Sequence, residues 1–464
     1  MISIDILPDD ILPVIFNFYV DANGETSSKE STDRWQLLVH VCHRWRRIVF
    51  ESPRRLNLQL GCTPGTPVRD ALDIWPPLPL LIWSKSAQPT DSVDNILAAL
   101  ERVNLVRQID LRDAPSSHLE TVSAAMQVPF PELTVLVLDS KDETVPVLPE
   151  SFLGGFAPCL EHLQFGHIPF PGLPKLLLSA ANLAYLRLYD IPHSGYFPPE
   201  AMAAALSTST NLSILLLFFQ SPQSRPDPES RCPPPLTRPV LHNLIYFFFK
   251  GVSEFLEEIV ARIDTPRLSS LSISFFNQIL FDTPQLIQFI SRTPRFKAFK
   301  GVRLFFENDH AKVELFSRTP GSGLLNVDIL CQDVDWQVSS LEQICTACLP
   351  PLPTLEDLYI SEGRYSRLHW PDNIENTLWL ELLRPFASVK NLYLSGQVAP
   401  HIVPALDELI GARTTEVLPT LQNIFLEELQ LSGPVQEGVG RFIATRQVAG
   451  HSIAVSRWEN PGRF

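Results

Sequence analysis

A short apolar code recurs along most of this 464-residue chain and limits the folds open to it. The code has apolar residues at its first, fourth and sixth positions, and twelve copies start at a mean spacing near 29 residues. In an extended segment alternate side chains point to the same face, so the fourth and sixth positions of each copy turn toward one core. A unit this small cannot bury that face alone, and stacking of neighbouring units covers it. The copies are Val106/Ile109/Leu111, Leu133/Leu136/Leu138, Leu160/Leu163/Phe165, Leu183/Leu186/Leu188, Leu212/Leu215/Leu217, Leu241/Leu244/Tyr246, Leu268/Leu271/Ile273, Phe299/Val302/Leu304, Leu324/Val327/Ile329, Leu355/Leu358/Ile360, Val389/Leu392/Leu394 and Leu421/Ile424/Leu426.

The spacing of these copies resembles that of leucine-rich repeats with a helical return segment. Helix-like patterns lie between copies, for example at residues 254–260 and 284–290. The resemblance implies an α/β solenoid, an irregular leucine-rich-repeat-like array of about twelve strand units with a parallel concave sheet. A doubly wound α/β domain is the alternative, and it would need longer buried strands without a fixed apolar code.

The array proper is expected over residues 105–464, after a connecting segment at 53–104. Short strands are expected in that segment near residues 56–60 and 78–83, with a helix at 69–75 between them. This segment is expected to start the sheet and to protect its first edge from pairing with other chains.

Two further segments stand out from the repeats. Residues 221–239 contain seven prolines, which prevent a regular helix, so we expect a surface loop there, with a flexible recognition element as the alternative. Residues 435–464 are expected to cap the array, with a helix near 435–447 and a strand at 453–458.

Residues 1–52 carry a different pattern, that of two amphipathic helices. Pro8 suits a first helical turn, where its missing N–H costs nothing, and the two aspartates after it complement the helix dipole. A second helix is expected over residues 35–50, after a polar insertion at 21–33. A helical hairpin of this size is only marginally stable alone. We therefore expect its apolar surface to dock on another protein, or on the array as a cap.

The string LPDDILPVIF and the later Val-Cys-x-x-Trp segment resemble an F-box, the motif that binds a Skp-family adaptor. The resemblance covers about 45 residues and departs from the family in its long polar insertion, while Cys42 matches a buried family position. Together with degenerate repeats, segments such as TPVRDALDIWPPLP and NTLWLELLRPF are similar to the expanded F-box families of mushroom-forming fungi. The resemblance assigns adaptor binding to Leu7, Pro8, Ile11, Leu12, Ile15, Phe16, Val41, Cys42 and Trp45.

Charge and composition exclude several classes of partner. The chain has 37 basic and 51 acidic residues, a net charge of −14, and no basic stripe, which argues against a nucleic-acid partner. Its apolar runs are far shorter than the ~20 residues of a membrane helix. The residues after Met1 lack a signal-peptide pattern, and seven scattered cysteines do not form a disulfide framework. We expect a protein of the cytoplasm and/or the nucleus with no membrane partner.

No pattern of catalytic residues stands out. The chain lacks a G-x-S-x-G elbow, a phosphate loop, a G-x-G-x-x-G turn and an H-E-x-x-H helix. Cys345 and Cys348 have the spacing of half a zinc or redox site, but a structural zinc needs four ligands. The helical apolar spacing of residues 341–348 favours buried structural cysteines instead. We therefore expect no enzyme activity, no cofactor and no metal.

A row of outward-facing residues gives a candidate binding surface. In each copy the residue between the last two apolar positions is expected to face solvent, and in the last three copies this residue is Tyr359, Tyr393 or Phe425. Strands ~4.8 Å apart would align the three rings, and exposed aromatic surface is typical of an interface. We hypothesise that they bind the substrate; the alternative is that the C-terminal tail, with Trp458 and Phe464, folds over them. Earlier copies place Val137, Gln164, Arg187, Leu216, Ile245, Ser272, Arg303 and Asp328 at this position.

The two resemblances together imply the substrate-recognition subunit of a Skp–cullin–F-box type ubiquitin ligase. The F-box would bind the Skp-family adaptor, and through it a cullin–RING ligase, while the array captures a protein substrate. Such a receptor needs no catalytic group, because it works by positioning its substrate. A free-standing leucine-rich-repeat ligand-binding scaffold without a ubiquitin role is the alternative, and a hydrolase or transferase is a third.

Overall fold

The computed structural model describes residues 7–21, 34–53, 56, 58–85, 93–142, 144–226, 233, 235, 237–277, 281–317, 319, 321–351, 353–363, 370, 374–427 and 433–458. The chain forms two compact units, one of Met1–Phe197 with Ala204–Thr210, and one of Pro198–Ala203 with Asn211–Phe464. The polar insertion predicted at 21–33 lies, except for Asp21, outside the described residues, as does Phe464.

The first unit begins with three short helices, α1 (Leu12–Asp21), α2 (Arg34–Val39) and α3 (His43–Glu51). The prediction of one helix over residues 35–50 is wrong. Cys42 has extended backbone angles, φ −160° and ψ 168°, and its Sγ accepts a hydrogen bond from the N–H of Trp45 at 3.5 Å. Cys42 therefore caps the start of α3 and separates it from α2.

Six described strands of the first unit pair in sequence order, all in parallel. They are β1 (Leu60–Cys62), β2 (Leu80–Lys85), β3 (Val106–Ala114), β4 (Val135–Ser140), β5 (His162–Gly166) and β6 (Tyr185–Ile191). The return segments carry α4 (Val68–Ile74), α5 (Asp94–Leu100), α6 (Ser116–Ala125) and α7 (Leu173–Leu177), with 3₁₀ turns at Phe152–Gly155 and His193–Gly195. Leu136, Leu163 and Leu186 are in register and fully buried, so the fourth position of the code forms the core as predicted.

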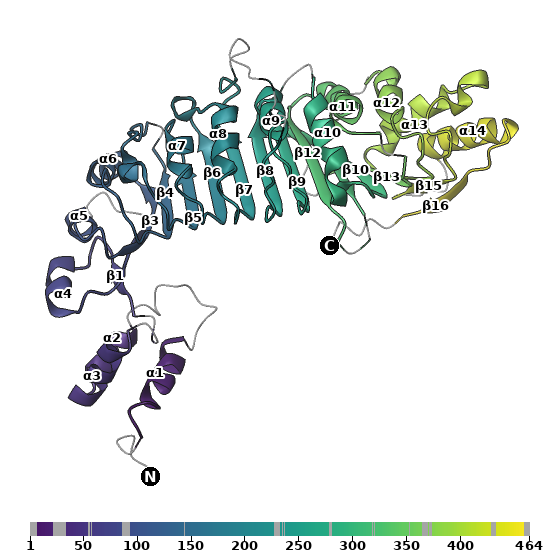
Figure 1. Ribbon diagram of the computed structural model, residues 1–464. Helices are drawn as coiled ribbons and strands as arrows, with labels where there is room; N and C mark the ends of the chain where they lie inside the picture. Colours follow the sequence, from purple (N-terminus) through teal and green to yellow (C-terminus); the bar gives the residue numbers. More distant parts are fainter. Residues whose placement is uncertain are drawn as a thin grey trace. The chain divides into compact units, whose positions relative to one another are not determined.

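The second unit has ten described strands in the order β7-β8-β9-β12-β11-β10-β13-β14-β15-β16. They are β7 (Ile214–Phe219), β8 (Tyr246–Gly251), β9 (Ser270–Phe275), β10 (Gly301–Phe306), β11 (His310–Phe316), β12 (Leu324–Leu330), β13 (Asp357–Glu362), β14 (Asn391–Leu394), β15 (Asn423–Leu426) and β16 (Ala454–Arg457). Its helices include α9 (Ser253–Val260), α10 (Pro284–Arg292), α11 (Val334–Gln343), α12 (Asn376–Leu383), α13 (Ala399–Asp407) and α14 (Pro434–Val448), and α8 (Pro199–Leu206) spans the unit boundary. Short 3₁₀ turns lie at Pro294–Phe296 and Gly411–Thr415, and a π-helix at Ile344–Cys348 follows α11. In both units helices lie along one side of the strands, as expected for an α/β repeat (Figure 1).

The expectation of a wholly parallel sheet is wrong at one place in the second unit. β11 pairs antiparallel with both β10 and β12, and β12 rather than β10 pairs with β9. The link from Phe306 to His310 is a tight turn, closed by the Glu307 N–H donating to the His310 carbonyl at 2.9 Å. A link this short cannot make the crossover that parallel pairing needs, so the chain forms a hairpin.

Two copies of the code lie in a different frame from the predicted one. In the copy at Leu324, Leu325 and Val327 are in register with Leu271 and Ile273, so Asn326 and not Asp328 pairs with Ser272. In the copy at Leu241 the shift is three residues. Phe247 and Phe249, not Leu244 and Tyr246, are in register with Leu215 and Leu217 and are buried. Tyr246 is 42% exposed, because it precedes the first inward position of β8. The outward residue of this strand is therefore Phe248 and not Ile245, since Phe248 pairs with Leu216.

Three residues expected to face solvent are buried, namely Val137, Gln164 and Tyr359. Val137 and Gln164 lie side by side on β4 and β5 of the first unit, with Asp110 on one flank and Arg187 on the other. In the Pro-rich segment 221–239 the described residues contain no helix, and Arg238 Nε donates to the Ala261 carbonyl at 2.7 Å.

Candidate protein-binding surfaces

Large apolar side chains are exposed on α1 and α2 and on the residues beside them. We call Ile11, Val14, Ile15, Phe18, Tyr19, Leu37 and Val41 the apolar N-terminal face. These seven are among eighteen large hydrophobic residues that are exposed in the described part of the chain. Phe18 is 73% exposed and Leu37 59% exposed, so this short segment presents far more apolar surface than a single scattered residue would.

The opposite side of α1 forms a small core with α3. Leu12, Phe16 and Val20 are buried, and the Phe16 ring lies 4.7 Å from the Trp45 ring between centroids. α1 is therefore apolar on two faces, of which only one is covered by this chain.

Ion pairs fix the start of α1 to α3. Asp9 accepts hydrogen bonds from Arg44 at 2.8 Å and from Arg47 at 3.0 Å, and the Arg44 bond holds the pKa of Asp9 below its usual value. Arg44 also donates to the Leu7 carbonyl. These contacts orient the segment that carries Pro8 and Ile11.

The nine residues assigned to adaptor binding fall into three groups in the structure. Pro8, Ile11, Ile15 and Val41 are exposed, and Leu7 is half-buried. Leu12 and Phe16 are buried and Trp45 is half-buried against Phe16, so these three support the face from behind. Cys42 is exposed, and the buried position that the family resemblance implied for it is wrong, because it serves as a helix cap.

α2 is anchored to the segment that follows the three helices. Trp35 is buried, its Nε1 donates to the Gln59 carbonyl at 2.8 Å, and its ring lies 5.2 Å from that of Trp75. Phe50 completes this aromatic cluster. One side of α2 thus packs on its own unit, while Leu37 and Val41 remain on the apolar N-terminal face.

The structure aligns the three predicted aromatic residues of the second unit, which we call the aromatic row. Tyr359 on β13, Tyr393 on β14 and Phe425 on β15 are in register. The Tyr359 and Tyr393 rings stack at 4.2 Å and 10°, and the Tyr393 and Phe425 rings at 4.4 Å and 8°. The row is therefore a continuous stack across three parallel strands.

The C-terminal tail also reaches this row. The Trp458 ring lies 5.5 Å from that of Tyr393 and 5.8 Å from that of Tyr359. Tyr359 is only 9% exposed, whereas Tyr393 and Phe425 are half-buried. The predicted alignment of the three rings is confirmed, and Trp458 of the tail packs against two of them, while substrate binding by the row stays a hypothesis.

Charged and polar residues border the aromatic row. Arg303 is in register with Tyr359, lies over the Phe316 ring at 3.9 Å and pairs with Glu314. At the start of β13, β14 and β15, Asn391 donates to Asp357 at 2.7 Å, and Asn423 donates to Asn391 at 2.8 Å. This chain of hydrogen bonds fixes the three strands in register beside the rings.

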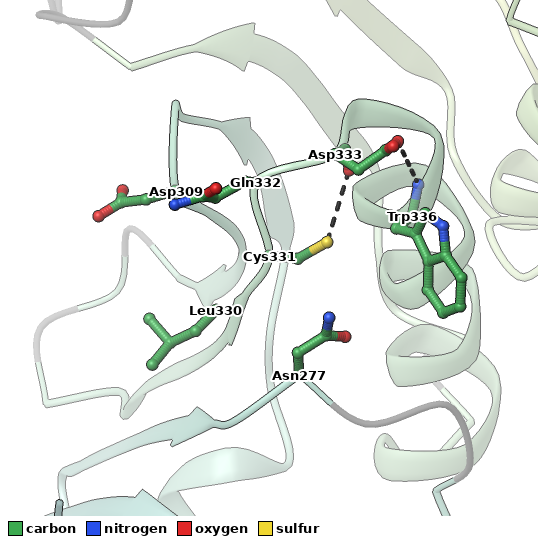
Figure 2. Close-up of a pocket in the computed structure, with 7 residues that line it drawn as sticks. All are labelled: Asn277, Asp309, Leu330, Cys331, Gln332, Asp333 and Trp336. Atoms are coloured by element: carbon green, nitrogen blue, oxygen red, sulfur yellow. Dashed lines mark hydrogen bonds between the residues drawn. The ribbon is translucent and has the colours of Figure 1, made fainter. Parts of the chain in front are cut away.

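A pocket of about 540 Å³ opens beside α11 (Figure 2). Its lining comes from α11, from the ends of β9 and β12, and from the turn between β10 and β11. The Cys331 thiol donates to the Asp333 carbonyl at 3.5 Å, and burial raises the pKa of this thiol. Asp333 in turn accepts from the N–H of Asp335 at 3.0 Å and caps α11. A protonated thiol is a poor nucleophile, so these residues do not form an activated cysteine. The lining residues are Asn277, Asp309, Leu330, Cys331, Gln332, Asp333 and Trp336.

Cys345 and Cys348 lie on the π-helix and are buried. Burial raises the pKa of Cys348 to about 12, and that of Cys345 is raised as well. Within the described ranges no group of three or more His, Cys, Asp or Glu residues could hold a metal ion. None of the helices in that part of the chain has the length and the continuous apolar character that crossing a bilayer requires.

The sequence did not predict a polar cluster at the end of β4, β5 and β6 in the first unit. His167 lies 3.6 Å from Asp139 and 3.6 Å from Asp190. Burial, followed by a hydrogen bond to Asp139, raises the pKa of the nearby Tyr189. Asp113, His167 and Asp190 all have positive φ angles where strands end. A recurring Asp or His after a strand is the only sequence signal for this cluster.

No family model and no curated protein matches the chain. Twelve chains of known structure match it, among them the leucine-rich repeat-containing protein LegL7 from Legionella pneumophila. That match has 12% sequence identity and a TM-score of 0.26, and it covers 86% of this chain and 99% of LegL7. A likeness at this level carries no weight, and the description of the repeats rests on burial and strand register.

Proposed function

We propose that this chain is the substrate-recognition subunit of a Skp–cullin–F-box type ubiquitin ligase. The first three helices would bind a Skp-family adaptor, and the repeat units would capture a protein substrate. The observation that carries the proposal is the apolar N-terminal face. The F-box resemblance of LPDDILPVIF and Val-Cys-x-x-Trp supplies the identity of the partner.

Binding of the adaptor would cover the exposed side chains of α1 and α2. Burying apolar surface is worth roughly 25 cal/mol per Å², so covering side chains as exposed as Phe18 and Leu37 would stabilise a complex substantially. The covered side of α1, through Phe16 and Trp45, holds the face in place without the partner. A preorganised apolar helix face fits a groove on another helical protein.

The aromatic row is the candidate substrate-binding surface of this receptor. Tyr393 and Phe425 are half-buried, and aromatic side chains of this kind dominate the energetics of protein interfaces. Arg303, stacked on Phe316 and paired with Glu314, forms a polar border beside the row. No catalytic step is proposed for this chain, because transfer of ubiquitin would belong to the assembled ligase.

Co-purification of the full chain with a fungal Skp-family adaptor tests the proposal. Ile15→Asp combined with Leu37→Asp places charges on the apolar N-terminal face, and we expect at least a hundredfold loss of adaptor affinity. Leu178→Asp is the matched control, since Leu178 is 53% exposed in the same unit but lies outside the face. We expect this control to bind the adaptor like the wild type.

Two results would count against the ligase role. A folded wild-type chain that does not bind any Skp-family adaptor would contradict it directly. Equal loss in Leu178→Asp and in the double variant would show that added charge, and not the face, is responsible. A chain that fails in the adaptor assay but still captures a protein through Tyr393 would be the free-standing scaffold instead.

A further inference from the structure

We propose that the aromatic row binds an extended peptide segment that adds as a strand beside β15, in the place now held by the chain's own β16. The segment would carry an aromatic residue where Trp458 lies. This inference rests on the aromatic row being the binding surface of the proposed receptor, and it names the way a partner is recognised there.

Within β16 itself the backbone, and not the side chains of Ala454–Arg457, holds the strand at the edge of the sheet. All four residues of Ala454–Arg457 have exposed side chains. The strand pairs in parallel with β15, and the flanking bonds are Ala454 N–H to the Gln422 carbonyl and Trp458 N–H to the Leu426 carbonyl, each 2.9 Å. A four-residue edge strand that buries so little apolar surface belongs to the least stable parts of a fold.

Two side chains at the ends of this strand anchor it. Ile453 is 6% exposed, and Trp458 packs against Tyr393 and Tyr359. Ser456 is in register with Phe425, so a small residue stands at the end of the aromatic row. Trp458 comes two residues later on the same face, and its ring reaches the rings of β14 and β13.

The chain can release β16 without losing the helix before it. α14 is fixed by buried Phe442 and by Arg446, which donates to the Val417 carbonyl. After α14 the chain turns at Gly450, where φ is +86° and a Cβ would meet nothing within 4 Å. Gly450 ends α14 as a C-cap glycine: its N–H donates to the Gln447 carbonyl at 3.0 Å, and the His451 N–H donates to the Arg446 carbonyl at 2.9 Å. The helix is therefore closed by its own hydrogen bonds, independently of β16.

The chain's own segment, residues 453–458, thus indicates which partner segment the surface would accept. The pattern is an apolar residue, a small residue three positions later and an aromatic residue two positions after that, as in Ile453, Ser456 and Trp458. Backbone hydrogen bonds to β15 would supply affinity for any extended chain, and the stacked rings would select the aromatic residue. A partner segment with this pattern competes with β16 for one site.

Fluorescence anisotropy of a labelled peptide of residues 452–458 tests this in the full chain. Ala454→Pro removes one backbone donor and Trp458→Ala removes the ring, so the double variant should hold its own segment less well. We expect the peptide to bind the double variant at least tenfold more tightly than the wild type. Adding Tyr393→Ala, or using a peptide whose tryptophan is replaced by alanine, should weaken binding at least tenfold.

Trp336→Ala is the matched control, because Trp336 is 46% exposed in the same unit but lines the pocket beside α11. Circular dichroism establishes that each variant is folded. Hydrogen exchange on the wild type provides an independent measurement. We expect the Ala454 and Trp458 amides to exchange at least tenfold faster than the Asn391 amide, which donates to the Glu356 carbonyl.

The inference is overturned if a folded double variant does not bind the peptide, or binds the alanine peptide equally well. It is also overturned if the β16 amides exchange as slowly as that of Asn391. These outcomes are separate from the adaptor assay, which probes the apolar N-terminal face. Adaptor binding without peptide binding refutes only this inference, whereas peptide binding without adaptor binding refutes only the ligase role.

Discussion

The ring of Phe16 on α1 packs at 4.7 Å, between centroids, on the ring of Trp45 on α3, and the two planes are tilted by 53°. Phe16 is almost completely buried, while Ile15, next to it in sequence, is 38% exposed. The boundary between the core of the three helices and the apolar N-terminal face therefore runs between adjacent residues. Substitutions on the two sides of this boundary should have different consequences.

Phe16→Ala should destabilise the three-helix segment by about 3 kcal/mol, because it removes a buried aromatic ring and leaves a cavity. Ile15→Ala should change the stability by less than about 0.5 kcal/mol, because Ile15 is partly exposed. Native-state hydrogen exchange of the α3 amides measures both effects without requiring the whole chain to unfold in one step. The affinity for the adaptor should fall in Ile15→Ala, although the α3 amides of this variant remain as protected from hydrogen exchange as in the wild type. Equal exchange rates in the two variants would contradict this assignment of faces.

Asp333→Ala should destabilise the second unit by about 1 kcal/mol, because Asp333 is the N-cap of α11. Its carboxylate accepts from the N–H groups of Asp335 at 3.0 Å and of Trp336 at 3.5 Å. Asp333→Asn keeps an oxygen acceptor, so it should lower the free energy of unfolding by only a few tenths of the loss in Asp333→Ala. Urea unfolding followed by tryptophan fluorescence gives the comparison. A larger loss in the asparagine variant than in the alanine variant would show that the cap is not the cause.

Gly166→Ala should destabilise the first unit by about 1–3 kcal/mol, because β5 has no room for a Cβ at this position. A Cβ there would lie 2.2 Å from Tyr189 Cζ and 2.3 Å from Asp139 Oδ1. Combining it with Tyr189→Ala should restore part of the loss. Thermal unfolding of both single variants and the double variant gives the coupling energy. Additive losses would mean that Tyr189 does not set the limit at Gly166.

The repeat units and the aromatic row were predictable because both follow from the two-residue period of a strand. Leu392 and Leu394 are buried and Tyr393 between them is not, and the same alternation repeats at Phe425 on β15. Stacking of equivalent positions then follows from equal register, which the polar pair of Asn391 and Asn423 reinforces. The sequence carries this information locally.

The features that the sequence did not predict depend on contacts between distant residues or on a single backbone angle. The apolar pattern of residues 35–50 continues through Cys42, so only its extended conformation reveals the break between α2 and α3. The alternating residues of β11 have the same period as any other strand, and the direction of pairing is set by the short turn at Glu307. The packing of Trp458 on Tyr359 joins residues far apart in sequence, so the sequence offered it only as an alternative and could not decide it.

The stability of the second unit should depend on pH through Glu257 of α9. Its carboxylate accepts from the N–H groups of Gln285 at 2.9 Å and Leu286 at 2.7 Å, at the start of α10. Burial nevertheless raises the pKa of Glu257 to about 7, and the backbone hydrogen bonds only partly oppose this. The folded chain therefore binds a proton here that the unfolded chain releases at lower pH. The stabilising contribution is complete below about pH 4.5 and is lost as the pH rises through 7.

Glu257→Gln keeps a neutral oxygen acceptor for Gln285 and Leu286 at every pH, so it should remove this dependence. Relative to the variant, the wild type should lose about 1–2 kcal/mol of unfolding free energy between about pH 4.5 and pH 7.5, a value reduced for partial exposure. Urea unfolding at a series of pH values measures the difference. Glu120→Gln on α6 is the control for removing an exposed glutamate. A wild-type minus variant difference that is constant, or that grows with pH, would mean that Glu257 is already ionised at low pH and acts as an ordinary helix cap.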